Sequence, residues 1–246
     1  MTNVVIFGAT SAIAESCARE LATEGAGIFL LARSLPRMET LREDLAVRGA
    51  KSVSSAEFDA AKIDAIPALV DACWRQLGTV DVAIIAFGTL SNQELCSRDA
   101  GELVREFSTN ALATIVLAEA LAGRLEAQRS GALVVISSVA GDRGRASNYA
   151  YGAAKAAVTA FTSGLRQRLR SSGVNVLTVK PGFVDTPMTA QFPKGALWAT
   201  PSKVASDILH AVRRGRGVLY TPWFWRPIMF VIKNLPETLF VRFGPR

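Results

Sequence analysis

Short apolar runs that alternate with longer helical stretches are the feature that most restricts the fold of this chain. Most of these runs are continuously apolar, which is typical of strands buried on both faces of a parallel sheet. Parallel strands need long, right-handed crossovers, so the pattern predicts an α/β fold with a doubly wound parallel sheet, the Rossmann fold. The predicted strands are Val4–Phe7, Ile28–Leu31, Val53–Phe58, Val82–Ala86, Leu133–Ile136, Val174–Val179 and Gly217–Tyr220.

Helical stretches fill the intervals between these strands. Half of the 246 residues are apolar, and this length is within the range of one α/β domain. No repeat or linker interrupts the chain, so we predict one Rossmann-fold domain over residues 1–220 and a C-terminal amphipathic extension over residues 221–246. The expected helices are Ala12–Glu24, Arg37–Arg48, Ile63–Leu77, Ala100–Arg129, Tyr149–Ser171 and Pro201–Arg214.

The few cysteines and the single histidine limit the kinds of functional site that the chain can form. Cys17, Cys73 and Cys96 lack the spacing of metal ligands or disulfides, which suits buried residues in a reducing compartment. The single histidine, His210, argues against a histidine metal site and against a Ser-His-Asp triad. The first residues run directly into an apolar strand without the basic start of a signal peptide, so we expect a cytoplasmic protein.

A tyrosine and a lysine four residues apart indicate the chemistry. Tyr151 and Lys155 share one face of the expected helix. A fixed ammonium beside a phenol lowers the phenol pKa from its usual ~10. The tyrosine could then exchange a proton near neutral pH, as carbonyl–alcohol interconversion requires. Ser138, just beyond a predicted strand, could hold the substrate oxygen.

Other motifs fall where doubly wound sheets bind ligands, at the carboxyl ends of strands. Residues 8–14 (Gly-Ala-Thr-Ser-Ala-Ile-Ala) follow the first strand and open the first helix, which is the position of a phosphate-binding turn. Pro181 and Gly182 follow the sixth strand, and Asn110 is a polar residue in a mostly apolar helix. Each has an ordinary structural explanation by itself, but their order along the chain favours one site.

With these residues in this order, the chain resembles the short-chain dehydrogenase/reductase family over roughly residues 1–220. The resemblance implies that Tyr151 is the catalytic acid/base and that Lys155 lowers its pKa and contacts the nicotinamide ribose. It also implies that Ser138 positions the carbonyl and that Asn110 holds a water in the proton relay.

The same resemblance implies a dinucleotide cofactor along the carboxyl edge of the sheet. The loop over the nicotinamide would begin at Pro181, and Asp59 corresponds to the family's adenine-contacting aspartate. The expected cofactor-binding residues are Gly8, Thr10, Ser11, Ala12, Ile13, Arg33, Ser34, Asp59, Ala60, Ala86, Gly88, Tyr151, Lys155, Pro181, Gly182, Val184 and Thr186.

Two motifs depart from the family's pattern. Only Gly8 remains of the three glycines in T-G-x-x-x-G-x-G, and the methyl group of Ala12 would approach the pyrophosphate. The amides at the helix N-terminus remain, so the change need not abolish binding. Ala86-Phe-Gly88 stands where the family commonly has Asn-Ala-Gly, which should not block the chemistry. A catalytically silent dinucleotide-binding protein is therefore an alternative.

The end of the second strand indicates which dinucleotide is used. Enzymes that use NAD tend to place an acid there, against the ribose 2′-hydroxyl, whereas NADP enzymes place an arginine nearby. Residues 30–34 contain Arg33 and no carboxylate, and a guanidinium can bind a 2′-phosphate through two hydrogen bonds. We therefore expect NADPH (NADP) rather than NADH.

The C-terminal segment is basic and rich in large apolar residues. From residue 211 to residue 246 seven basic side chains accompany one acid, so +6 of the net charge of +7 lies there. Its longest uncharged apolar run, Ile228–Ile232, is far shorter than the ~20 residues that span a bilayer. Pro227 and Pro236 are expected to divide it into short helices. Peripheral contact with the inner face of the cell membrane and packing on the protein itself both fit this composition. No nucleic-acid motif is present.

Within the family, residues 86–88, residues 137–145 and the tail are similar to the reductase subunits of decaprenylphosphoryl-β-D-ribose 2-epimerase. That resemblance implies a 2-keto sugar carried on a polyprenyl phosphate, with Arg143 and Arg145 near the phosphodiester. A 3-oxoacyl thioester or another lipophilic ketone is the alternative substrate. Further substrate-cleft residues are expected at Tyr149, Phe192 and Trp198, although Tyr149 could equally be a packing residue.

The resemblance also implies an oligomer. The family often pairs the helices that carry Asn110 and Tyr151 between subunits, and the alanines around Lys155 would allow close packing. A homodimer or homotetramer is therefore expected, with a small-molecule or lipid-linked ketone as the other partner.

Overall fold

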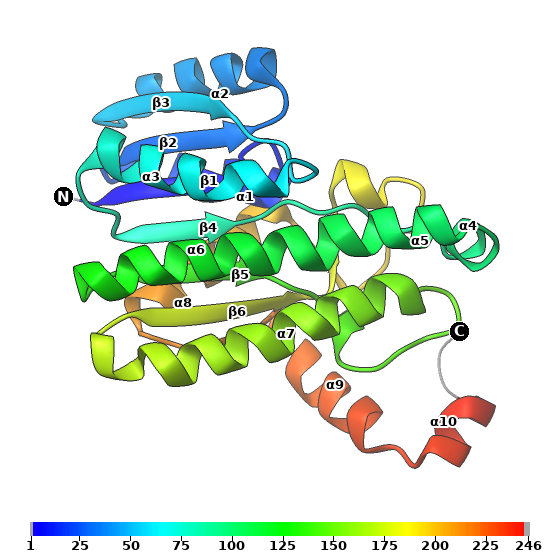
Figure 1. The fold of residues 1–246 in the computed structure, drawn as a ribbon. Helices are drawn as coiled ribbons and strands as arrows, with labels where there is room; N and C mark the ends of the chain where they lie inside the picture. Colours follow the sequence, from blue (N-terminus) through cyan, green and yellow to red (C-terminus); the bar gives the residue numbers. More distant parts are fainter. Residues whose placement is uncertain (1, 244–246) are drawn as a thin grey trace.

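A seven-stranded parallel sheet forms the centre of the computed structural model, which describes residues 2–243 (Figure 1). Its strand order is β3-β2-β1-β4-β5-β6-β9, so the chain winds outward from β1 in one direction and then from β4 in the other. All seven predicted strands are confirmed, and so is the doubly wound fold. The strands are β1 (Asn3–Phe7), β2 (Gly27–Ala32), β3 (Ser52–Glu57), β4 (Val82–Ile85), β5 (Ala132–Ile136), β6 (Asn175–Pro181) and β9 (Val218–Thr221).

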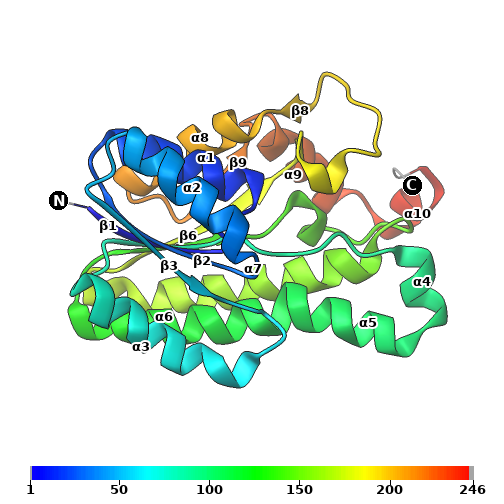
Figure 2. The same ribbon diagram turned by 90° about the horizontal axis from the view of Figure 1, so that it is seen from above.

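Helices cover both faces of this sheet, as the view from above shows (Figure 2). One apolar core lies between the sheet and three helices, α1 (Ala12–Thr23), α2 (Leu35–Val47) and α8 (Pro201–Arg213). A second core lies between the opposite face and three others, α3 (Ile66–Leu77), α6 (Ala113–Gln128) and α7 (Tyr149–Leu169). Because both faces are buried, the strands can be apolar at every position, as the central strands are.

The predicted helix 100–129 is interrupted in the structure. It consists of α5 (Ala100–Phe107), a π-helical turn η2 (Ser108–Leu112) and α6. Sequence spacing did not reveal this turn, because one extra residue per turn shifts the apolar stripe without ending it. A helix before it, α4 (Gln93–Arg98), was also missed, since six residues are too few for a periodic pattern.

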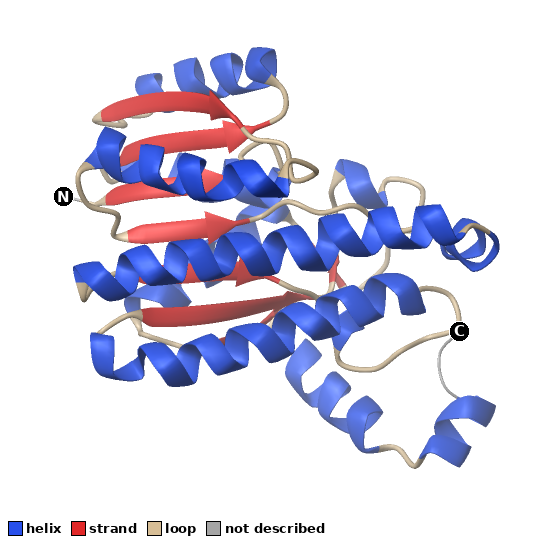
Figure 3. Cartoon of the chain, viewed as in Figure 1, coloured by secondary structure: helices blue, strands red, loops and turns tan. Residues whose placement is uncertain are grey.

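The remaining elements are short (Figure 3). Two of them, β7 (Phe183–Val184) and β8 (Trp198–Ala199), pair as a small separate sheet beyond β6. The 3₁₀ turns are η1 (Ile63–Ala65), η3 (Val139–Gly141), η4 (Arg170–Ser172) and η5 (Pro187–Thr189).

The tail forms two helices near the carboxyl ends of the strands, α9 (Trp225–Asn234) and α10 (Glu237–Phe243) (Figures 1 and 2). Pro236 separates them as expected, but Pro227 lies inside α9 and does not divide it. Proline is tolerated there because amides in the first turn of a helix have no intrahelical partner. The last three residues of the predicted extension, 244–246, lie outside the described part of the chain.

One face of α9 is packed on the domain. Trp225 is 3% exposed and Met229 is fully buried, and both contact Val139 in an apolar cluster. The opposite face is open, with Phe230 69% and Val231 59% exposed, and Trp223, just before the helix, is 76% exposed. Within residues 2–243 no helix is both long and apolar enough to cross a bilayer.

Candidate functional site

The three residues expected to act on the substrate meet beyond the end of β5. Ser138 follows β5 and begins η3, while Tyr151 and Lys155 lie one turn apart on α7. The Lys155 ammonium is 5.7 Å from the centre of the Tyr151 ring, and its Nζ donates to the Ile136 carbonyl over 3.2 Å. Ser138 lies near enough to the Tyr151 phenol to lower its pKa, so hydroxyl, phenol and ammonium form one group.

Two glycines allow α7 to come this close to η3. A Cβ on Gly141 would lie 2.6 Å from the Lys155 carbonyl carbon, and one on Gly152 would lie 2.9 Å from the Ala140 carbonyl oxygen. Side chains at either position would push the helix away. Glycine at both positions therefore brings Tyr151 within reach of Ser138.

Burial dominates the ionisation of this pair. It raises the pKa of Tyr151 to about 12, with Ser138 acting in the opposite direction. It also lowers the pKa of Lys155 to about 8, because a charge at this position is poorly solvated. The expected lowering of the tyrosine pKa by the neighbouring ammonium is therefore wrong for the protein by itself: desolvation by burial dominates, and the opposing cause is Ser138 rather than Lys155.

Asn110 is fully buried in the π-helical turn, behind the lysine. Its Oδ1 accepts from the Thr89 main-chain N–H at 3.0 Å, and its Nδ2 donates to the Thr89 hydroxyl at 3.0 Å. Gly88 separates Asn110 from Lys155: a Cβ there would lie 2.9 Å from Asn110 Oδ1 and 3.5 Å from Lys155 Nζ. The loop after β4 thus needs glycine between these two side chains.

Sequence reasoning missed a buried carboxylate beside Asn110. Glu106 is 8% exposed, and its Oε2 accepts from the hydroxyls of Thr89 and Ser91, both at 2.8 Å, and from Asn110 Nδ2 at 3.3 Å. A carboxylate can only accept, so it holds the Asn110 amide in one orientation. The sequence did offer one indication of this contact: Glu106 and Asn110 are four residues apart, a spacing that brings two side chains together on a helix.

The predicted phosphate-binding turn lies at the switch point between β1 and β4. Gly8 has a φ of +79°, and a Cβ there would lie 2.6 Å from the Phe87 main-chain nitrogen. Ser11 caps α1 by accepting from the Ala14 amide at 3.3 Å, and Ala12 is partly exposed in the first turn. Thr10 and Ile13, on either side of Ser11 and Ala12, are also partly exposed.

The residues predicted to hold the adenosine end are found after β2 and β3. Arg33 is exposed and has no ion pair within residues 2–243. Ser34 caps α2 by accepting from the Arg37 amide at 3.4 Å. Asp59 accepts from the Ala61 amide at 3.0 Å, and Ala60 is partly exposed beside it. Nothing in these contacts occupies the Arg33 guanidinium.

The loop expected over the nicotinamide packs against the C-terminal tail. Pro181 ends β6, Val184 lies in β7, and Thr186 caps η5. A methyl group on Gly182 would overlap the Trp225 indole nitrogen, so glycine is needed here for α9 to pack. Ala86 follows β4 and is buried.

The predicted substrate residues divide into two groups. Trp198 stacks on Phe183 with ring centres 5.4 Å apart, and Phe192 is 43% exposed in the same region of chain after β6. Tyr149, by contrast, hydrogen-bonds through its hydroxyl to Ser97 of α4 at 2.9 Å. The packing alternative is thus favoured for Tyr149.

Arg143 is directed to the tail rather than to the predicted site, which corrects its assignment to the substrate. It donates to the carbonyls of Ile232 at 2.7 Å and Leu235 at 2.6 Å, at the end of α9. It also pairs with Glu237 at 2.6 Å and lies 4.0 Å from the Phe240 ring centre. Carbonyls at a helix C-terminus lack partners within the helix, so a guanidinium is well matched to them.

A buried ion pair also holds the loop between Ser138 and Tyr151 in place. Lys180, the residue before Pro181, pairs with Asp142, and both side chains are buried. The Tyr220 hydroxyl donates to the same carboxylate at 2.7 Å. The loop after Ser138 is therefore tied to β6, to β9 and to α9.

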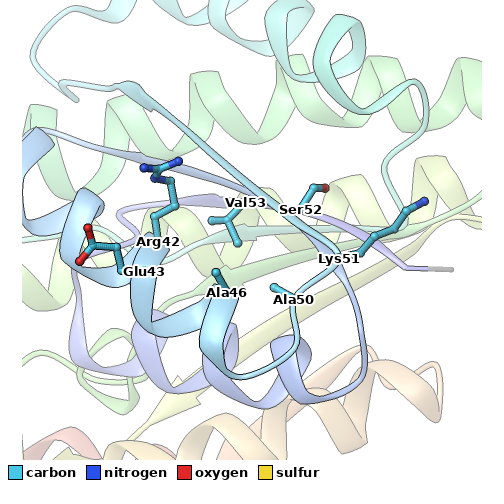
Figure 4. A pocket seen from close by; sticks show the side chains of 7 residues that line it. All are labelled: Arg42, Glu43, Ala46, Ala50, Lys51, Ser52 and Val53. Atoms are coloured by element: carbon cyan, nitrogen blue, oxygen red, sulfur yellow. The ribbon is translucent and has the colours of Figure 1, made fainter.

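A surface hollow elsewhere in the molecule lies between α2 and β3 (Figure 4). It is at the amino end of β3, whereas the predicted catalytic residues are at the carboxyl ends of the strands. It is lined by Arg42, Glu43, Ala46, Ala50, Lys51, Ser52 and Val53.

Comparison with known protein families points to one family. A family model described as "short chain dehydrogenase" matches residues 2–196. An uncharacterised oxidoreductase of Mycobacterium tuberculosis is 37% identical over 239 residues, covering 97% of this chain and 96% of that protein. The ketoacyl reductase HetN of a Nostoc species is 31% identical over 217 residues, covering 85% of this chain and 75% of its own.

Solved structures give the same picture. A short-chain dehydrogenase/reductase family protein has a TM-score of 0.78 and 26% identity, covering 89% of this chain and 94% of its own. Levodione reductase has a TM-score of 0.81 over 89% of this chain and 95% of its own. Its identity of 22% makes it a comparison of fold alone.

We predict that Gly8→Ala lowers the free energy of unfolding by about 3–5 kcal/mol, since it combines a left-handed backbone with overlap against Phe87. Gly25→Ala is the matched control. Gly25 has a similar φ of +73° but open space around its Cβ, so about 1–2 kcal/mol should be lost. Urea denaturation measures both. Equal losses would mean that the loop after β4 simply moves away.

Proposed function

Because the chain belongs to the short-chain dehydrogenase family and is therefore an NAD(P)-dependent oxidoreductase, we propose that it uses NADPH to reduce a ketone to an alcohol. The observation that carries this proposal is the grouping of Ser138, Tyr151 and Lys155 beyond β5, with Asn110 buried behind them. Hydroxyl, phenol and ammonium together can polarise a carbonyl oxygen and protonate it.

The raised pKa of Tyr151 suits it to the reductive direction. With a pKa of about 12 the phenol carries its proton at neutral pH and can donate it to a developing alkoxide. The Ser138 hydroxyl, which lies near that phenol, would hold the same oxygen. Lys155 would stabilise the phenolate left after transfer, because its pKa of about 8 keeps most of it charged at pH 7.

The chain fits a dinucleotide at this edge. Gly8 and the start of α1 present a turn at the switch point, and Arg33 offers an exposed guanidinium without an acid partner in residues 2–243. The α1 amides would hold the pyrophosphate and Arg33 the 2′-phosphate. When bound, NADPH would supply the hydride.

The substrate we propose is a lipophilic ketone. The segment after β6 exposes Phe183, Met188, Phe192 and Leu197, each more than 40%, around the proposed nicotinamide loop. A 2-keto sugar on a polyprenyl phosphate and a 3-oxoacyl thioester both combine a ketone with an apolar carrier. The similarity to HetN, a ketoacyl reductase, supports the second.

The open face of α9 supports peripheral membrane contact by this enzyme. Phe230 and Val231 on α9, and Trp223 just before it, are exposed together with Arg226 and Lys233, which is the combination that interfacial helices use on anionic lipid. The opposite face of the helix packs against the substrate loops.

A second apolar surface supports a homo-oligomer. An apolar hollow between α5 and α7 is lined by Leu103, Val104 and Phe107, together with Tyr149 and Ala153. We propose that these two helices pair with a second copy.

Tyr151→Phe should stop the oxidation of NADPH that wild type shows with ketones, because the phenyl ring cannot donate a proton. We expect at least a 100-fold loss, roughly the contribution of a general acid. Tyr149→Phe is the control and should keep most of its turnover, since its hydroxyl is bonded to Ser97. Absorbance at the NADPH band, with a panel of keto sugars and 3-oxoacyl thioesters, measures this. An unaffected Tyr151→Phe enzyme would refute the proton-donor role.

Arg33→Ala should raise the KM for NADPH by about 10- to 100-fold, the worth of a charge-assisted hydrogen bond, while the KM for NADH changes little. Arg37→Ala is the comparison. Arg37 donates to the Thr10 carbonyl at 2.8 Å, so its loss should affect both cofactors alike. A wild-type preference for NADH would contradict the assignment of NADPH.

Wild type should sediment with vesicles that contain phosphatidylglycerol, whereas a Trp223→Ser, Phe230→Ser double variant should stay in the supernatant. Val47→Ser is the control, because Val47 is 90% exposed but lies on α2. Added salt should weaken wild-type binding. If the double variant sediments as wild type does, α9 is not the membrane contact.

A further inference from the structure

The loop between β4 and α4 carries Gly88 past the predicted catalytic residues, and side chains hold it in place. Residues 86–92 belong to no helix or strand, so no ladder of main-chain hydrogen bonds fixes them. Ala86, at the start of the loop, has only a methyl group and makes no side-chain hydrogen bond. The Thr89 main-chain N–H donates to a side chain, Asn110 Oδ1, at 3.0 Å. The position of the loop therefore depends on what holds the side chains around it.

Glu106 attaches this loop to the helix beside it. It lies in the last turn of α5, and its Oε2 accepts from the hydroxyls of Thr89 and Ser91, both at 2.8 Å. The same oxygen accepts from Nδ2 of Asn110, in the π-helical turn, at 3.3 Å. Asn110 Nδ2 donates in addition to the Thr89 hydroxyl at 3.0 Å. Four side chains from the loop and the helix thus share one set of hydrogen bonds, with the carboxylate as the common acceptor.

The donors in this set depend on the carboxylate. Ser91 is buried, and its hydroxyl makes no other hydrogen bond within residues 2–243. The Thr89 hydroxyl already accepts from Asn110, so it needs a separate acceptor for its own proton. Buried donors without partners are costly, and folded proteins leave few of them. A side chain at position 106 that cannot accept would therefore release the loop, because movement of the loop lets its hydroxyls bind water instead.

Release of the loop would affect the predicted catalytic group through Gly88. A Cβ at Gly88 would lie 2.9 Å from Asn110 Oδ1 and 3.5 Å from Lys155 Nζ, so the loop backbone lies beside the ammonium. Lys155 is 3% exposed, and burial lowers its pKa to about 8. Its neighbours are the Tyr151 ring, centred 5.7 Å away, and the Ile136 carbonyl, which accepts from it at 3.2 Å. A loop that moved away would admit water to this ammonium.

We propose that Glu106 is a positioning residue for the proposed reaction: it holds the loop after β4 against Lys155 and so keeps water from the ammonium. The inference rests on the proposed function, in which Lys155 stabilises the phenolate left by proton transfer. Glu106 acts through the side chains of Thr89, Ser91 and Asn110. The role requires a hydrogen-bond acceptor at position 106.

The state of Lys155 can be measured without turnover. An NMR pH titration of protein with ¹³C-labelled lysine follows each ammonium, and Lys155→Met identifies the Lys155 signal. Glu106→Leu keeps most of the side-chain volume but removes the acceptor. We expect the Lys155 pKa to rise in this variant from about 8 toward its usual 10.5, because water reaches the ammonium. Glu106→Gln retains an oxygen that can accept and should stay close to wild type.

Glu102→Leu is the matched control for this titration. Glu102 lies one turn earlier on α5 and pairs with Arg105, outside the shared set of hydrogen bonds, so its loss should leave the Lys155 pKa unchanged. If Glu106→Leu does not fold, Thr89→Val replaces it and should raise the pKa by a smaller amount, since Ser91 still donates to the carboxylate. An unchanged Lys155 pKa in Glu106→Leu, or an equal rise in Glu106→Gln, would overturn the proposal.

Kinetics separate this inference from the proposed reaction. With NADPH and 3-oxobutanoyl-coenzyme A, Glu106→Leu should lower kcat by about 10- to 100-fold, the scale of a misplaced catalytic group, with little change in the KM for the thioester. Wild-type activity should fall as the pH rises through about 8, where Lys155 loses its charge, and this fall should move to higher pH in Glu106→Leu. An unchanged kcat and pH profile would overturn the positioning role. If wild type reduces no ketone but the Lys155 pKa still responds to Glu106→Leu, the hold on Lys155 stands and the proposed reaction is wrong.

Discussion

The close approach of α7 to the segment after Ser138 is the constraint on which the site depends. Gly141 and Gly152 remove the side chains that would hold the two backbones apart. The Ser137 hydroxyl then donates to the Lys155 carbonyl at 2.9 Å and fixes the contact. Once helix and turn touch, the phenol, the hydroxyl and the ammonium have little freedom left. The unusual pKa values follow from the same packing, because a site built this tightly excludes the water that would solvate a charge.

Much of the fold could be predicted from the sequence, because strands buried on both faces are apolar at nearly every position. The positions of the glycine turn, Ser138 and Tyr151 could likewise be predicted, since each lies just after a predicted strand or at the start of a predicted helix. The contacts of Glu106 and Arg143 could not. Both side chains act on residues distant in sequence or across an irregular turn, and both have an ordinary surface explanation until the fold is known. The prediction of a lowered Tyr151 pKa was wrong for a related reason. A neighbouring charge can be seen in a sequence, whereas the extent of desolvation cannot.

The tail is more closely joined to the domain than its composition suggests. A basic, aromatic segment could be a free membrane anchor, yet α9 buries Trp225 and Met229 beside the loop that follows Ser138. Arg143 then caps the same helix from that loop. The two faces of α9 therefore differ: one packs on the protein and the other is exposed. Only this helix separates the exposed face from the loop that follows Ser138.

The Arg143 contacts make two distant segments of the chain depend on each other. The arginine belongs to the loop between Ser138 and Tyr151, whereas its acceptors belong to the last 15 residues of the chain. The family model ends at residue 196 and so does not include the second half of this pair. The loop and the C-terminal helices therefore support each other in this structure, although more than 70 residues of sequence separate them. A change of tail that moved these carbonyls would leave a buried guanidinium without acceptors, so the loop restricts which tails the domain can carry.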